Sequence, residues 1–79
     1  MKHIIDADIV EARKKLAERI RDLRKKKGWT QQELADHADV TMRHIQRLES
    51  KKPSAIELDT IVRISAAFKI TSSEFLKNI

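Results

Sequence analysis

Two threonines, Thr30 and Thr41, constrain the fold of this chain more than any other feature. Each stands directly before a run in which apolar residues recur at helical spacing, where a threonine hydroxyl caps the first turn of a helix. Glu33 completes a capping box with Thr30, and Asp39 lies between the two runs, where aspartate tolerates a left-handed backbone. The segment 30–49 therefore predicts two short helices joined by a tight turn, the second extending over about 42–50.

The second of these helices is expected to have two distinct faces. Ile45 and Leu48 turn toward the first helix. Four other side chains project away from it within an arc of about 140°, at about 100° per residue: Met42, Arg43, Gln46 and Arg47. A helix whose outward face carries guanidinium and amide groups can read base edges in the major groove of DNA.

A longer helix precedes this pair and is expected to end near Lys27. Asp6 or Asp8 is a candidate cap for its start, and Gly28, the only glycine, suits a left-handed conformation at its end. Its core-facing stripe is predicted to be Ile9, Ala12, Leu16, Ile20 and Leu23.

Two further helices are expected after a loop at 51–57, in which Pro53 marks the end of the preceding helix. The first covers about 58–68, and its inward positions are Leu58, Ile61, Ile64, Ser65 and Phe68. The second opens with another capping box, Thr71 to Glu74, and turns Phe75 and Leu76 inward. Five helices with short connections predict one compact all-α domain spanning residues 1–79.

The net charge of +5 is concentrated in the first helix, between Arg13 and Lys27. Such an excess indicates an anionic partner, of which nucleic acid is the commonest, or simply a solvated helix face. The chain has no cysteine, which excludes disulfides and thiolate metal sites. No apolar run approaches the ~20 residues of a membrane span, and the start does not have the core of a signal peptide, so a cytoplasmic location is expected.

These features together resemble the Cro/repressor-type helix-turn-helix family, also called the XRE family. The residues that carry the resemblance are Ile20 to Arg24, Gly28, Thr30, Gln31, Glu33 to Ala35, Val40, Thr41, Ile45, Leu48, Glu49 and Ile64 to Phe68. The resemblance implies a five-helix lambda-repressor-like fold, with its core at residues 14–77 and an N-terminal extension of the first helix at 1–12. Asp39 departs from the family pattern, which usually has glycine in the turn.

The resemblance also implies roles for particular residues. Met42, Arg43 and Arg47 fall at base-reading positions, and Gln46 can join them. Thr30, Gln31 and Thr41 fall at phosphate-contacting positions, and Lys51 and Lys52 in the following loop are further candidates. Arg24 and Glu49 match a partly buried ion pair found in several members.

Each role has a plainer alternative. Arg43 and Arg47 could belong to a solvated surface, Met42 to the edge of the core, and Gln31 to ordinary helix chemistry. His37 and His44 fit surface positions. We expect no catalytic set, metal site or cofactor.

The predicted function is a sequence-specific DNA-binding transcriptional regulator, a repressor that binds double-stranded DNA as a homodimer. The dimer surface is expected at Phe75, Leu76 and Ile79, with a possible contribution from Ile4, Ile5, Ile9 and Val10. Two rival hypotheses remain open: a protein-interaction module such as the antitoxin of a toxin–antitoxin pair, and a basic amphipathic helix that binds anionic membranes.

Overall fold

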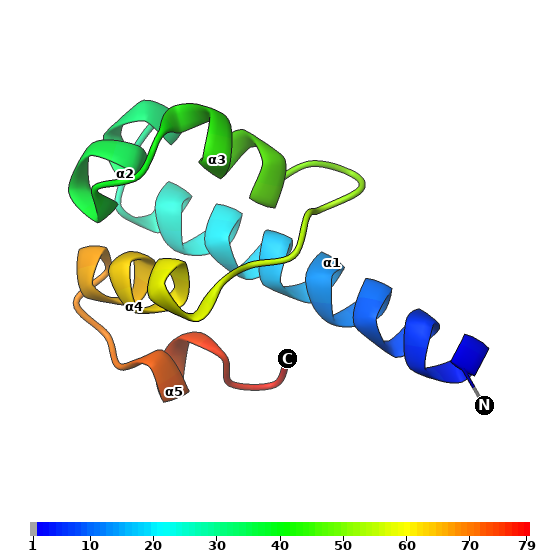
Figure 1. Ribbon diagram of the computed structural model, residues 1–79. Coiled ribbons are helices and arrows are strands. Elements are labelled where there is room, and N and C mark those ends of the chain that lie inside the picture. Colours follow the sequence, from blue (N-terminus) through cyan, green and yellow to red (C-terminus); the bar gives the residue numbers. More distant parts are fainter. Residues whose placement is uncertain (1) are drawn as a thin grey trace.

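The computed structural model describes residues 2–79, with side chains described for residues 6–79. The regular elements of this part of the chain are all helices, as predicted (Figure 1). They are α1 (Lys2–Lys26), α2 (Gln31–Ala38), α3 (Met42–Leu48), α4 (Leu58–Ala67) and α5 (Ser72–Phe75).

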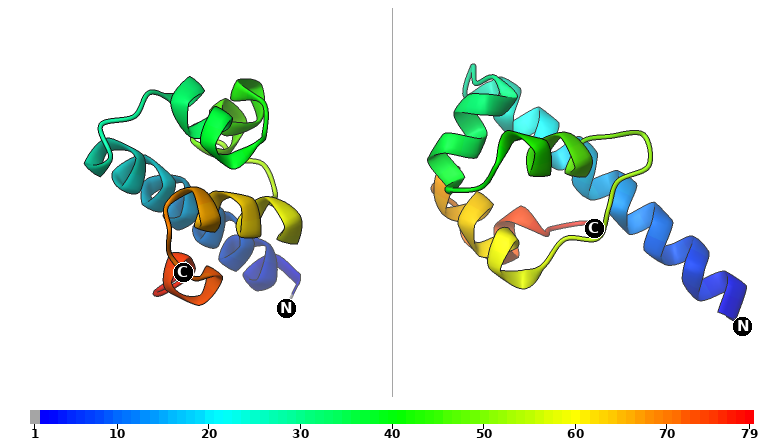
Figure 2. Two further views of the ribbon diagram at one scale, coloured as in Figure 1. Left: turned by 90° about the vertical axis from the view of Figure 1, so that its left-hand side faces the viewer. Right: turned by 45° about the horizontal axis from the view of Figure 1, so that its top comes forward.

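The four shorter helices gather around the C-terminal half of α1. Helix α2 packs against α3 and α4, α4 packs against α5, and α3 contacts α1. The N-terminal half of α1 projects beyond this cluster, as Figure 1 and the right-hand view of Figure 2 show. Only the second half of α1 therefore takes part in the core.

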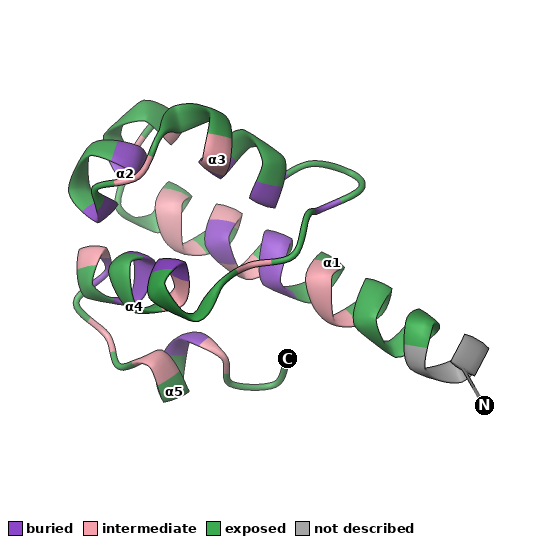
Figure 3. Cartoon of the chain, viewed as in Figure 1, coloured by how far each residue is buried: buried purple, intermediate pink, exposed green. Residues whose placement is uncertain are grey.

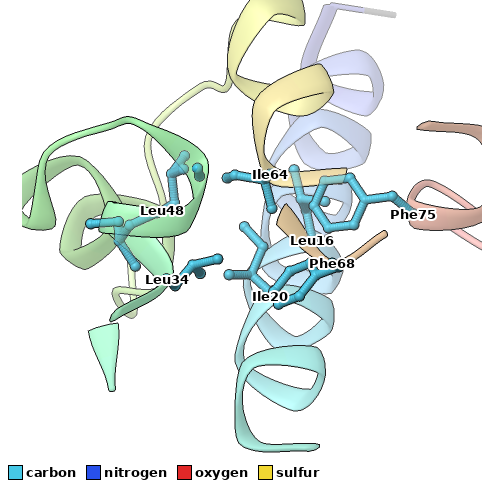
Figure 4. Close-up of a cluster of buried hydrophobic side chains, with 10 residues drawn as sticks. Leu16, Ile20, Leu34, Leu48, Ile64, Phe68 and Phe75 are labelled. Atoms are coloured by element: carbon cyan, nitrogen blue, oxygen red, sulfur yellow. The ribbon is translucent and has the colours of Figure 1, made fainter. Parts of the chain in front are cut away.

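The core is one apolar cluster to which every helix contributes (Figure 4). Its largest fully buried side chains are Phe75, Ile20, Leu34, Ile45 and Ile64. The side chain of Arg19 ties α5 to α1, since its Nε donates to the carbonyl of Phe75 at 3.3 Å and its Nη2 to that of Glu74 at 2.9 Å. The complete burial of Phe75 contradicts its predicted place on a dimer surface.

The predicted start of the first helix was wrong. Helix α1 begins at Lys2, so Asp6 and Asp8 lie inside it rather than capping it. The predicted stripe faces the core from Leu16 onward, but Ile9 is 43% exposed. In Figure 3 the buried stretches of α1 lie in its C-terminal half. The helical spacing of apolar residues continues into the N-terminal half of α1, against which no other described helix packs. The apolar side chains of the stripe in that half therefore remain at least partly exposed to solvent.

The predicted turns agree with the structure, but only one of the two predicted capping boxes is complete. Gly28 and Asp39 both adopt left-handed conformations, with φ of 71° and 56°. The capping box at Thr30 is complete, whereas Thr71 accepts from the backbone N–H of Glu74 and the reciprocal bond is not found among the described residues. A third left-handed residue, Lys69 with φ of 58°, ends α4 without a glycine to mark it in the sequence.

Two predictions about the later helices need correction. Helix α3 ends at Leu48, with Glu49 as its C-cap, and Pro53 is buried in the loop beyond it. Leu58, predicted to face inward, is 71% exposed. At about 100° per residue it lies to one side of the line through Ile61, Ile64 and Phe68, and the core does not reach it.

Candidate nucleic-acid interface

The orientation of α3 is set by its packing on α2. Ile45 and Leu48 are 0% and 2% exposed and belong to the same cluster as the inner face of α2. Ala35 and Ala38 provide that inner face, and their small side chains let the two helices approach closely. Because one side of α3 is buried in this way, its opposite side must face outward.

Local chemistry defines where α3 begins. Thr41 is the N-cap, with extended backbone angles, and its hydroxyl accepts from the backbone N–H of His44 at 3.1 Å. The preceding turn is tight because Asp39 is left-handed and donates its N–H to carbonyls at the end of α2. The cap and the turn together place Met42 and Arg43 in the first turn of α3, so the register of its outward face is decided locally.

The outward face of α3 carries Arg43, Gln46 and Arg47, all exposed. They line a shallow hollow of about 300 Å³ together with Ser50, Lys52 and Ser54. Within residues 6–79, none of the three outward side chains is held by a hydrogen bond or an ion pair to another residue. The structure therefore brings these predicted residues together and leaves their donors available.

Met42 lies at the edge of this face and is 38% exposed. That exposure is compatible with both of its predicted roles, contact with a thymine methyl group and packing at the border of the core.

The loop after α3 folds back along the helix, a feature that the sequence did not predict. The backbone N–H of Ser54 donates to the carbonyl of Arg47 at 3.4 Å, and Ser54 lines hollows on both sides of Arg47. Lys51 and Lys52, both exposed, lie in this loop, and Lys52 reaches the same hollow as Arg43. No local pattern marks Ser54, because its position depends on how a long loop closes.

Arg24 and Glu49 form a bidentate ion pair between α1 and the end of α3. The guanidinium Nε and Nη2 donate to the two carboxylate oxygens, each at 2.9 Å, and the side chains are only 13% and 3% exposed. The hydrogen bond to Glu49 raises the pKa of Arg24 above its ordinary value, and the charge attraction of Glu49 adds to this against the opposing effect of burial. The guanidinium of Arg24 therefore stays charged at neutral pH.

Three further bonds extend this ion pair into a network. Arg24 Nη1 donates to the carbonyl of Trp29 at 2.9 Å, and Arg21 Nη2 donates to the carbonyl of Glu49 at 2.8 Å. Gln31 Nε2 donates to Glu49 Oε1 at 3.3 Å. The network joins α1, the start of α2 and the end of α3, so it holds the helix pair against the long helix.

Gln31 has a structural role that the sequence did not reveal. Its amide is half-buried and bonded to Glu49, eighteen positions away. Thr30 is exposed, and its hydroxyl accepts from the N–H of Glu33 at 3.1 Å, which leaves the hydroxyl proton available to an external acceptor. The two neighbouring residues thus differ in how readily they reach a ligand.

His37 and His44, the histidines whose side chains the structure describes, belong to no metal-binding group. His37 stacks on Trp29, with ring centroids 4.1 Å apart, and Trp29 stacks in turn on Phe68. Among the described residues, no group of three or more His, Cys, Asp or Glu side chains is placed to hold a metal ion. None of the described helices is long and apolar enough to cross a membrane.

Comparison with known proteins identifies the family. A search of curated proteins found no match. The chain matches the family model HTH_3, described as helix-turn-helix, over residues 20–75. That match spans most of the chain and includes α2, the left-handed turn and α3. The chain therefore belongs to the HTH_3 family of XRE-type helix-turn-helix DNA-binding proteins.

Proposed function

We propose that this protein is a sequence-specific transcriptional repressor that binds a palindromic operator as a homodimer in the cytoplasm. The observation that carries the proposal is the outward face of α3, where the side chains of Arg43, Gln46 and Arg47 are exposed and form no hydrogen bond or ion pair within residues 6–79. To read base edges, a helix must be held firmly by its packing and must present guanidinium or amide groups that are free to donate two hydrogen bonds.

The chemistry of each side chain suggests what it reads. Arg43 and Arg47 can each donate two hydrogen bonds to O6 and N7 of guanine, and Gln46 can pair its amide with N6 and N7 of adenine. Such a bidentate contact discriminates against the wrong base by about 1–3 kcal/mol. Met42 adds an apolar contact to a thymine methyl group.

Phosphate contacts would fix the register of α3 in the groove without carrying sequence information. The exposed hydroxyls of Thr30 and Thr41 stand at the starts of α2 and α3. Lys51 and Lys52 extend the contact beyond the end of α3, and Gln31 contributes if it turns from Glu49 toward a phosphate.

Dimerisation would place two copies of α3 in successive major grooves, about 34–36 Å apart. The C-terminal surface offers Ile79, which is 40% exposed, and the partly buried Leu76. The N-terminal surface offers Ile9 and Val10, which are 43% and 47% exposed. The side chains of Ile4 and Ile5, also predicted at this surface, lie outside the described residues.

Selection of bound sites from random duplex DNA tests the proposal, followed by affinity measurements on the selected site with every single-base change. Arg43→Ala is expected to relax specificity at one base position by about 5- to 150-fold, which corresponds to the loss of one bidentate contact. Arg43→Lys is the matched control, because it keeps the positive charge but cannot form the fork. If both variants discriminate among bases as well as the native protein does, Arg43 does not read DNA.

One observation favours a second function, that of an antitoxin whose principal partner is a protein. Leu58 and Val62, one turn apart on α4, are 71% and 51% exposed, and such a pair suits a protein contact. Replacing both with serine should abolish binding to that partner and leave operator affinity unchanged. A native protein with only weak, sequence-independent DNA affinity would favour this second function over the first.

A further inference from the structure

The N-terminal half of α1 has a basic surface that the reading of bases by α3 does not use. The loop between α3 and α4 passes over the middle of α1 (Figures 1 and 2). A hollow of about 560 Å³ lies between them, lined by Val10, Arg13, Lys14, Lys51, Lys52 and Pro53. The buried ring of Pro53 seats the loop here, so the basic side chains of two distant segments are brought together by the fold.

This hollow is continuous with the candidate interface on α3. Lys52 lines both the hollow beside α1 and the one beneath Arg43 and Arg47. The residues that line these two hollows include six cations and no carboxylate: Arg13, Lys14, Arg43, Arg47, Lys51 and Lys52. We call these six residues the basic track.

The other flank of α1 has a different character. The hollow there is lined by two acidic residues, Glu18 and Asp22, together with Lys15, Arg19, Lys77, Asn78 and Ile79. Glu18 also lines a neighbouring hollow with Lys14, Lys51 and Pro53, so one carboxylate borders the track, whereas none lines the hollow that Arg13 and Lys14 share with Lys51 and Lys52.

The cations of the basic track are also unpaired within the described part of the chain. The ion pairs found there are Arg19–Glu74, Arg24–Glu49 and Arg63–Asp39, and none involves a residue of the track. Val10 and Pro53 provide an apolar floor along which lysine stems can lie while their ammonium groups reach outward.

The geometry points to a second DNA contact: Arg13 and Lys14, with Lys51 and Lys52, bind backbone phosphates of the duplex that flanks the bases contacted by α3. This inference rests on the proposed function, because α3 must first bring the duplex to this side of the molecule. The continuity of the track with Arg43 and Arg47 makes duplex DNA, rather than a separate anion, the partner that fits it. A continuous set of cations suits the regular row of phosphates along a duplex.

The contact has a specific signature. Each phosphate neutralised by a cation steepens the dependence of log K on log salt concentration by about 0.9. Loss of Arg13 and Lys14 should therefore reduce the slope by about 1–2 and weaken binding at 0.1 M salt by roughly 10- to 60-fold. Because the backbone is the same in every sequence, the preference among bases should not change.

The test compares two double variants on duplexes of two lengths, one limited to the selected operator and one with about ten extra base pairs on each side. Arg13→Gln with Lys14→Gln removes the α1 part of the track. Lys15→Gln with Lys77→Gln is the matched control, since it removes the same charge from the opposite flank. Native protein and control should gain affinity from the flanking DNA, and the track variant should lose most of that gain.

The double variant Lys51→Gln with Lys52→Gln removes two other positive charges of the basic track. Both residues lie in a loop, so this variant does not affect the stability of a helix. If the variant Arg13→Gln with Lys14→Gln matches the control in affinity and salt slope, the second contact does not exist, even where loss of Lys51 and Lys52 weakens binding, because those two lysines also belong to the proposed contact of α3. If the native protein selects no operator yet the track variants still weaken binding to duplex DNA, the proposed base reading fails and the backbone contact stands.

Discussion

Removal of the carboxylate of Glu49 should be among the most damaging single changes on the surface between α1 and α3. Glu49 accepts two bonds of 2.9 Å from Arg24 and one of 3.3 Å from Gln31, with its side chain only 3% exposed. Glu49→Ala leaves Arg24, whose side chain is 13% exposed in the native protein, with the carbonyl of Trp29 as its remaining partner. Breaking one side of a buried pair costs about 3–5 kcal/mol, and the bond to Trp29 places the expected loss near the lower figure.

That loss is large for a chain of this size. A chain of this length has a free energy of unfolding of roughly 4–12 kcal/mol. A loss of about 3 kcal/mol should lower Tm by roughly 12–24 °C. Urea denaturation followed by the fluorescence of Trp29, the only tryptophan, measures the change directly, because the indole stacks on His37 and Phe68 only in the folded protein.

The control variant is Glu49→Gln, which keeps an acceptor oxygen but removes the charge. It should lose about 1–2 kcal/mol, the difference between charge-assisted and neutral hydrogen bonds. A double-mutant cycle with Arg24→Met then isolates the pair, and the double variant should lose much less than the sum of the single variants. A loss below about 1 kcal/mol for Glu49→Ala, or additive effects in the cycle, would refute the assignment of the pair as a buried, coupled interaction.

Two further predictions concern the turn and the core. Asp39→Gly should raise the free energy of unfolding by about 0.5–1 kcal/mol, since glycine adopts the left-handed conformation without strain and the lost Arg63 ion pair is exposed and worth little; a lower Tm than that of the native protein in thermal denaturation would count against this. Phe75→Ala should cost about 3–5 kcal/mol because the ring is completely buried in the core. If Phe75→Ala instead changed only the oligomeric state in analytical ultracentrifugation, with unchanged monomer stability, Phe75 would belong to a dimer surface after all.

Features that depend on neighbours in the chain could be predicted from the sequence alone. The caps at Thr30 and Thr41, the left-handed turns at Gly28 and Asp39, and the outward set on α3 all follow from bonds or spacings within a few residues. A capping hydroxyl needs only the amide three positions away, and a left-handed turn needs only a residue that tolerates it. These features were enough to predict the helix-turn-helix and its family.

Only the tertiary structure decided which apolar residues are covered and which charges meet. Ile9 and Leu58 have core-like spacing but are exposed because no element lies opposite them, whereas Phe75 is completely buried because α5 folds back toward α1. Gln31 forms a hydrogen bond with Glu49, and Arg13 and Lys14 line the same hollow as Lys51 and Lys52. Both arrangements depend on how loops close, which local sequence patterns do not describe. Helical periodicity specifies the direction in which a side chain points from the helix axis. Whether that side chain is buried or paired with a charge depends on which other part of the chain lies in that direction.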